Sequence, residues 1–281
     1  MKNENVLEII GLCKKYPKFT LDSVSFSVKE GEIMGFIGRN GAGKTTTIKS
    51  VLGLVNPDGG EVRFFGRRMC EDESEIKQQI GYACGSIGYY PRRRLCDTVA
   101  VTRRFYGNFD ETLYKKYLSD FSIDESKRPI ELSEGMKVKF NLALALSHHA
   151  KLLILDEPTS GLDPVSREEL LEIFLSLAND GVSILFSTHI TSDLVKCADS
   201  VTYIKGGRVE ASMPIGEYTD GYRLVRFDAE PSEDKKRVLH GICRSRDGFT
   251  GLVRACDAES FSGKPLVQPT LEEVMVHLEM R

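Results

Sequence analysis

The chain has 281 residues, of which 41% are hydrophobic and 9% aromatic, enough to bury the core of one large domain or of one domain plus an appendage. Its formal net charge of −3 provides no overall basic field that would attract nucleic acid or anionic lipid, so we expect no nucleic-acid partner. No stretch approaches the ~18 consecutive apolar residues that a membrane-spanning helix requires, and we expect no such segment.

The seven cysteines are odd in number and form no CxxC pair, at positions 13, 70, 84, 96, 197, 243 and 256. Neither a disulfide framework nor a zinc site is indicated by this spacing. We therefore expect a protein of the reducing cytoplasm.

The first part of the chain has strand-like patterns separated by Gly and Pro residues, which are typical of turns. Apolar runs predict strands at residues 24–28, 33–37 and 62–65, and a helix from about 43 to 54 interrupts them. The region from about 74 to 150 is mostly helical in pattern, which indicates a helical insertion.

Two apolar segments follow, residues 152–155 and 182–186, separated by a helix-like stretch at 167–177. This spacing is typical of a βαβ unit in a buried parallel sheet, so the sequence predicts an α/β core.

The character of the chain changes after the turn at residues 205–208. We expect a main domain over residues 1–220 and an accessory α+β domain over 221–281. Thr270 and Glu273 have the spacing of a capping box, which predicts a final helix after Thr270.

Residues 38–45 read GRNGAGKT and match the pattern G-x-x-x-x-G-K-[ST], between an apolar strand and a helix. Glycines let backbone N–H groups close around phosphate oxygens, while Lys44 reaches the β and γ phosphates and the Thr45 hydroxyl binds Mg²⁺. The flanking strand and helix argue against a chance Gly-rich turn. The predicted ATP-binding loop comprises Gly38, Arg39, Asn40, Gly41, Ala42, Gly43, Lys44, Thr45 and Thr46.

Asp156 and Glu157 follow the buried strand at 152–155, at the strand end where open α/β sheets bind ligands. We interpret Asp156 as a Mg²⁺ ligand through water and Glu157 as the group that polarises the attacking water. A surface strand end is the alternative. His189 ends the next apolar strand, so we expect it beside Glu157 and in reach of the γ-phosphate, the alternative being a structural histidine.

Residues 132–136 read LSEGM and open a long helix, which alone is an N-cap signal. Together with four other motifs in this order, it resembles the ATP-binding-cassette family over roughly residues 6–213. The other motifs are GRNGAGKT, LLILDEP, the stretch SGLD at 160–163, and His189.

The resemblance implies a P-loop NTPase core with a mostly parallel sheet, an antiparallel β subdomain and a helical subdomain. It also implies a dimer of two cassettes, head to tail. ATP would lie between the P-loop of one cassette, here residues 38–45, and the helix that follows the signature motif of the other, here LSEGM at residues 132–136. Ser133 and Gly135 would then complete the partner's site, and Asp163 would lie at the dimer seam. Tyr16 stands where the family stacks an aromatic ring on adenine, a buried structural tyrosine being the alternative.

The implied function is an ATPase, ATP to ADP and phosphate, that drives a separate membrane permease from the inner face of the cell membrane. The stretches at 132–164 and 186–194 are also similar to bacterial cassettes that export antimicrobial peptides and drugs. The partner cassette can be a second copy or a different subunit. A regulatory subunit with little hydrolysis, and a soluble cassette protein outside transport, stay open as alternatives.

The chain departs from the family pattern at two places. Glu134 and Met136 replace the usual Gly and Gln of the signature. After the predicted strand at residues 80–82 the family has a Gln that touches Mg²⁺, where this chain has Gly85 and Ser86. We expect slow basal hydrolysis for that reason.

Overall fold

A computed structural model describes residues 5–84, 91–246, 248–261 and 263–280. The chain forms two compact units, residues 1–212 and 213–281. The division expected from the sequence, after residue 220, falls later. The short helix α8 (Ile215–Asp220) packs on α10 (Leu271–Glu279) and therefore belongs to the second unit.

The first unit is built on a six-stranded sheet with the order β10-β9-β3-β8-β7-β6. The pairs of β3 with β8 and β9, and of β7 with β6 and β8, are parallel. Strands β3, β7 and β8 are buried along their whole length, which explains why β3 and β7 are apolar almost throughout and why β8 has an apolar centre at residues 184–186. The strands are β3 (Ile33–Ile37), β6 (Ile80–Cys84), β7 (Leu152–Asp156), β8 (Ser183–Thr188), β9 (Ser200–Lys205) and β10 (Arg208–Pro214).

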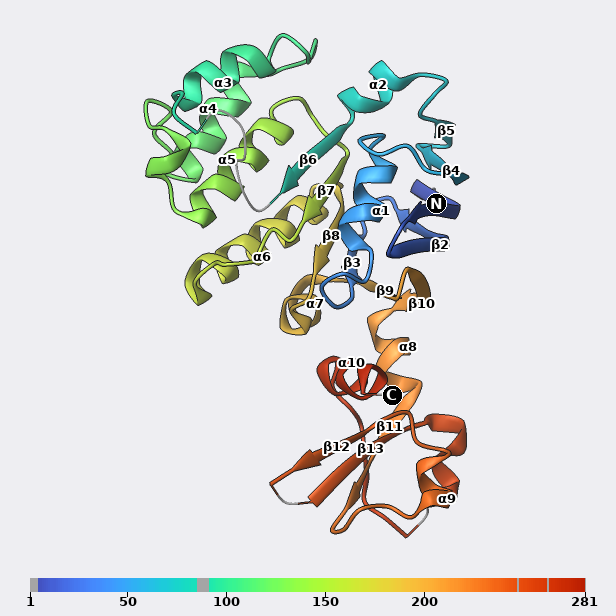
Figure 1. Ribbon diagram of the computed structural model, residues 1–281. Helices are drawn as coiled ribbons and strands as arrows, with labels where there is room; N and C mark the ends of the chain where they lie inside the picture. Colours follow the sequence, from blue (N-terminus) through green and yellow to red (C-terminus); the bar gives the residue numbers. More distant parts are fainter. Residues whose placement is uncertain (1–4, 85–90, 247, 262, 281) are drawn as a thin grey trace. The chain divides into compact units, whose positions relative to one another are not determined.

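Helices cover both faces of this sheet (Figure 1). Helix α1 (Lys44–Val51) packs on β7, and its Ile48 joins the same apolar cluster as Leu185 of β8. Helix α6 (Pro164–Asn179) packs on the opposite face, where the rings of Phe174 and Phe186 lie 5.6 Å apart. Helix α7 (Thr191–Cys197) contacts α6 and β3. The predicted α/β class with a mostly parallel sheet is confirmed.

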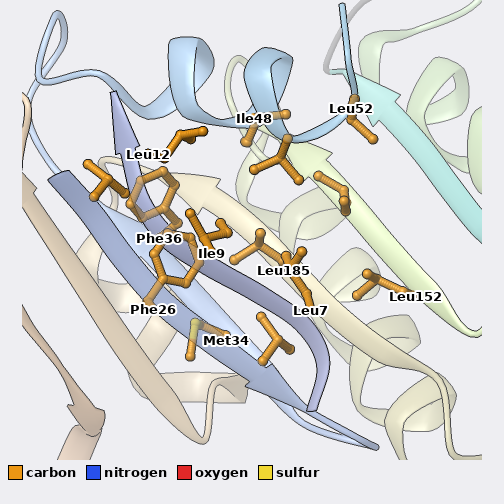
Figure 2. Packing of buried hydrophobic residues seen from close by; sticks show 14 of the residues in the cluster. Leu7, Ile9, Leu12, Phe26, Met34, Phe36, Ile48, Leu52, Leu152 and Leu185 are labelled. Atoms are coloured by element: carbon orange, nitrogen blue, oxygen red, sulfur yellow. The ribbon is translucent and has the colours of Figure 1, made fainter. Parts of the chain in front are cut away.

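A second sheet of four strands, in the order β2-β1-β4-β5, is antiparallel. Its apolar side chains pack onto β3, β7, β8 and α1, and Figure 2 shows Leu7, Phe26 and Phe36 within this shared core. The predicted antiparallel subdomain is therefore present. Its strands are β1 (Asn5–Tyr16), β2 (Phe19–Lys29), β4 (Gly59–Phe64) and β5 (Arg67–Arg68).

The helical part of the first unit has its own apolar cluster, in which Leu95, Tyr114 and Phe140 are fully buried. It is shorter than the expected insertion at 74–150, because β6 pairs with β7 as the edge strand of the main sheet. The short helix α2 (Glu73–Gln78) precedes β6. The inserted helices are α3 (Leu95–Thr102), α4 (Glu111–Asp120) and α5 (Glu134–Leu146), with a 3₁₀ turn at Pro129–Glu131.

The second unit has a four-stranded antiparallel sheet in the order β12-β13-β11-β14. The capping box that opens α10 is confirmed, because Thr270 Oγ1 accepts the Glu273 N–H and the Glu273 carboxylate accepts the Thr270 N–H. The remaining elements are α9 (Glu233–Lys236), β11 (Tyr222–Phe227), β12 (Ile242–Ser245), β13 (Gly248–Arg254), a 3₁₀ helix at Ala255–Phe261 and β14 (Leu266–Val267).

Candidate functional site

Three neighbouring strands of the main sheet end at the same edge. Ile37, the last residue of β3, is paired with Thr188 of β8, and Ser187 is paired with Asp156, the last residue of β7. The segments that leave these strands are the 38–45 loop, His189 and Glu157. Parallel register therefore brings together side chains that are far apart in the sequence.

The 38–45 loop can follow its path only because glycines occupy its tight points. A Cβ at Gly38 would lie 2.4 Å from the Ile204 carbonyl oxygen. Gly43 has a φ of 118°, and a Cβ there would lie 2.9 Å from the Phe19 ring. Glycine has no Cβ and tolerates this backbone conformation, so the loop closes tightly before α1 begins at Lys44.

Lys44 is 5% exposed and its ammonium group points into the loop. Its Nζ donates to the Gly38 carbonyl oxygen at 2.6 Å and lies 3.1 Å from Glu157 Oε1. A buried ammonium group needs such partners, because desolvation of an unpaired charge is costly. The lysine therefore joins the loop after β3 to the carboxylate after β7.

Asp156 accepts hydrogen bonds from two hydroxyl groups. Its Oδ1 accepts a hydrogen bond from Thr45 Oγ1 at 3.2 Å and another from Ser187 Oγ at 2.6 Å. A hydroxyl and a carboxylate are hard oxygen ligands of the kind that Mg²⁺ takes, usually with phosphate oxygens and water in the remaining positions. Thr45 and Asp156 thus fit a Mg²⁺ ion that arrives with a nucleotide.

Glu157 has an unusual backbone, with a φ of 51° in the left-handed region. Its N–H group donates to Ser187 Oγ at 2.9 Å, and its Oε2 lies 2.8 Å from His189 Nδ1. Both carboxylate oxygens therefore face cationic or N–H groups, one towards Lys44 and one towards His189. These contacts hold the carboxylate in one orientation.

An open cleft of about 620 Å³ lies over this edge of the sheet. The loop residues 39–41 and 43–46 line one side of it, with Glu157, Ser160 and His189 behind them. Tyr16, Lys18 and Phe19, from the turn between β1 and β2, line the cleft as well. Tyr16 is 39% exposed, so the alternative of a buried structural tyrosine is wrong.

Ser133, Gly135 and Asp163 lie at the starts of two helices, and none of them is among the residues that line this cleft. Ser133 caps α5 and accepts the Met136 N–H, while Asp163 caps α6 and accepts the N–H groups of Val165 and Ser166. Hydrogen bonds from Ser166 lower the pKa of Asp163. Within one chain the side chains of Ser133 and Asp163 therefore act as helix N-caps.

Gly85 and Ser86 lie outside the described residues. Gln78 and Gln79, which precede β6, have other partners. The Gln78 amide donates to the Phe105 carbonyl oxygen and accepts the Gly107 N–H, and the Gln79 amide donates to Glu75. Gln78 therefore ties α2 to the segment after α3.

Four residues at the site are additional to those predicted from the sequence, namely Lys18, Phe19, Ser160 and Ser187. Ser160 lies in the SGLD motif, and Ser187 precedes His189 by two residues, so motif proximity could have indicated both. Nothing local indicates Lys18 or Phe19, because the β1–β2 turn reaches the site through long-range packing.

The glycine loop between β3 and α1, with Asp156 and Glu157 at the end of β7, defines a P-loop nucleoside triphosphatase. Among the residues that the structure describes, no helix has both the length and the apolar character to cross a membrane.

Comparison with known proteins gives the family. The ABC transporter family profile matches residues 21–160. The chain is 34% identical over 238 residues to the bacitracin transport ATP-binding protein BcrA of Bacillus licheniformis, covering 83% of this chain and 78% of BcrA. It is 34% identical over 206 residues to the lantibiotic transport ATP-binding protein SrtF of Streptococcus pyogenes, covering 73% of this chain and 89% of SrtF.

Among solved structures, an ATP-binding subunit of an ABC transporter matches with a TM-score of 0.68 and 32% identity, covering 75% of this chain and 91% of that chain. The chain belongs to the ABC transporter family, as an ATP-binding subunit. Such subunits are ATPases coupled to transport, and they work with transmembrane permeases.

Proposed function

We propose that this chain binds Mg²⁺·ATP in the cleft at the end of β3, β7 and β8 and hydrolyses it as one half of a head-to-tail dimer. The observation that carries this proposal is the convergence of Lys44, Thr45 and Asp156 with Glu157 and His189 on one sheet edge. A phosphate-binding cation, two oxygen ligands and an oriented carboxylate are what phosphoryl transfer to water requires.

The roles follow from the positions of the side chains. Lys44 binds the β and γ phosphates, which compete with Glu157 for its ammonium group. Thr45 and Asp156 hold Mg²⁺, which neutralises the charge of the phosphates when it is bound. Glu157 polarises the attacking water and His189 contacts the γ-phosphate. Tyr16, at the wall of the cleft, stacks on the adenine ring.

The second half of each site comes from the partner cassette. Ser133 is exposed at the N-terminus of α5, where the N–H groups of the first helical turn favour a negative ligand. Gly135 lets the α5 backbone lie close to α6, because a Cβ there would be 3.2 Å from Ser166 Cβ. Asp163 lies at the start of that neighbouring helix, which supports its place at the dimer seam.

A matched pair of substitutions tests the dimer. Ser133→Asp and Ser133→Asn both keep a good N-cap, so neither should change the helix greatly. The aspartate alone places a negative charge against the partner's triphosphate, so we expect Ser133→Asp to abolish the ATP-driven dimer while Ser133→Asn retains it. Size-exclusion chromatography of both variants, with Mg²⁺·ATP and with a non-hydrolysable ATP analogue, measures the fraction of dimer. Equal dimerisation of both would exclude a composite site at Ser133.

For the transported substrate, we propose amphiphilic antimicrobial peptides, which are exported through a separate permease from the inner face of the cell membrane. The support is the similarity to the bacitracin and lantibiotic transport proteins. Whether the dimer partner is a second copy or another subunit is decided by co-purification with the permease.

The expected result with the permease in liposomes is ATP hydrolysis that rises severalfold on adding the cognate peptide. The same preparation carrying Lys44→Ala is the control. ATPase activity that no peptide changes would contradict the exporter assignment, and permease-bound protein with no hydrolysis would favour the regulatory alternative.

A further inference from the structure

Ser187 occupies a fully buried position at the centre of the site, although it does not line the nucleotide cleft. It is the second-last residue of β8, has 0% exposure, and is paired with Asp156 in the sheet register. Its side chain therefore lies between the ends of two strands that carry site residues.

The hydroxyl group of Ser187 has one hydrogen to donate and lone pairs that accept. It donates to Asp156 Oδ1 at 2.6 Å and accepts the Glu157 N–H at 2.9 Å. The two bonds use opposite capacities of one oxygen, so both form at the same time. One hydroxyl thus joins the carboxylate of one residue to the backbone of the next.

This link acts at a point where the backbone is strained. Glu157 has a φ of 51°, a conformation that non-glycine residues adopt only when their surroundings hold them in it. The Glu157 N–H also donates to the Ser187 carbonyl oxygen at 3.2 Å, so the hydroxyl and carbonyl oxygens of Ser187 both hold this peptide. A change in the Glu157 backbone would displace its carboxylate from Lys44 and His189.

We propose that Ser187 is a positioning residue for ATP hydrolysis. It fixes the Asp156 carboxylate and the Glu157 backbone relative to each other, so that the metal ligand and the water-polarising carboxylate keep one arrangement. This inference rests on the roles proposed above for Asp156 and Glu157. Ser187 itself touches neither nucleotide nor water in the reaction.

The test compares Ser187→Ala with Ser187→Thr and with Ser183→Ala. Ser183 is the matched control, because it is also fully buried in β8 and its Oγ also accepts a backbone N–H, that of Gly31 at 2.9 Å. It lies at the opposite end of the strand. Thermal unfolding of the two alanine variants measures the purely structural cost of losing a buried hydroxyl.

We expect Ser187→Ala to lower kcat by about tenfold to ~100-fold, since an error of about 1 Å in such a geometry costs about that much, while the KM for ATP changes by less than about threefold. Ser187→Thr keeps the hydroxyl and should recover most of kcat. Ser183→Ala should keep the wild-type kcat despite a similar loss of thermal stability. If Ser187→Ala is insoluble, Ser187→Cys keeps a group at the γ position and replaces the hydroxyl by a weak donor, and its kcat should fall likewise.

Glu157→Gln, measured in the same assay, separates the two levels of inference. Loss of hydrolysis in Glu157→Gln together with a wild-type kcat in Ser187→Ala or Ser187→Cys would overturn the role of Ser187 alone. Hydrolysis retained in Glu157→Gln would overturn the site assignment itself. A fall in kcat that Ser183→Ala reproduces would reduce Ser187 to a structural residue.

Discussion

Lys44→Ala should weaken ATP binding by about 10-fold to ~100-fold and abolish measurable hydrolysis, because a hydrogen bond from an ammonium group to a phosphate is charge-assisted and strong. The structure adds a second reason. Lys44 lies 3.1 Å from Glu157 Oε1, so its loss also releases the carboxylate that is proposed to polarise water. Binding and chemistry should therefore fail together.

Isothermal titration with Mg²⁺·ATP and a phosphate-release assay measure the two effects separately. Lys49→Ala is the matched control, because Lys49 lies on the same helix α1 but is exposed to solvent. It should bind ATP as the wild type does. Lys44→Ala with ATPase activity within about twofold of the wild type would rule out the proposed role of the P-loop lysine.

The parallel sheet could be predicted from the sequence because its central strands have a recognisable local sequence pattern. The runs that form β3 and β7 are apolar without interruption, and β8 has an apolar centre at residues 184–186. Each of these runs is followed by a polar or glycine-rich segment. A strand that is buried on both faces has apolar residues at consecutive positions, and such a run is easier to recognise in the sequence than an alternation of apolar and polar residues. The GRNGAGKT loop, the pair Asp156 and Glu157, and His189 each follow one of these runs, and this indicated which strand ends carry site residues.

The limits of the prediction lie where long-range pairing decides the structure. The sequence indicates a strand at residues 80–82, but this strand is short and lies between helices, so the local pattern assigns it to the helical insertion. Pairing with β7 makes the observed strand β6 part of the main sheet. The boundary expected after residue 220 differs from the observed division after residue 212 for a similar reason, since α8 belongs to the second unit through its packing on α10. Neither contact has a local sequence signal.

The site shows the same division. Motifs indicated Lys44, Asp156 and Glu157, because each follows a recognisable strand. The hydrogen bonds of Ser187 could not be foreseen, since they depend on the register of β8 against β7. The left-handed backbone of Glu157 is also a property of the assembled strand ends. Sequence patterns predict which groups are present, and register decides which of them touch.

Glu157→Gln should bind ATP normally, hydrolyse it ~10²- to 10⁴-fold more slowly, and accumulate as an ATP-bound dimer, because the amide keeps the shape of the side chain but cannot act as a base. The surroundings of Glu157 favour one orientation of that amide. Its oxygen should face the Lys44 ammonium group, and its NH₂ group should face His189 Nδ1. His189 then carries its proton on Nε2 and can donate to the γ-phosphate, so ATP affinity is preserved.

Single-turnover phosphate release and size-exclusion chromatography with Mg²⁺·ATP measure the rate and the dimer. Glu168→Gln is the control, because Glu168 is a half-exposed carboxylate paired with Lys196 at the surface and removing its charge leaves the site intact. It should hydrolyse ATP at the wild-type rate and form no stable dimer. Because the amide conserves the volume of the side chain, a monomeric Glu157→Gln protein with full activity could be explained only by another residue polarising the water.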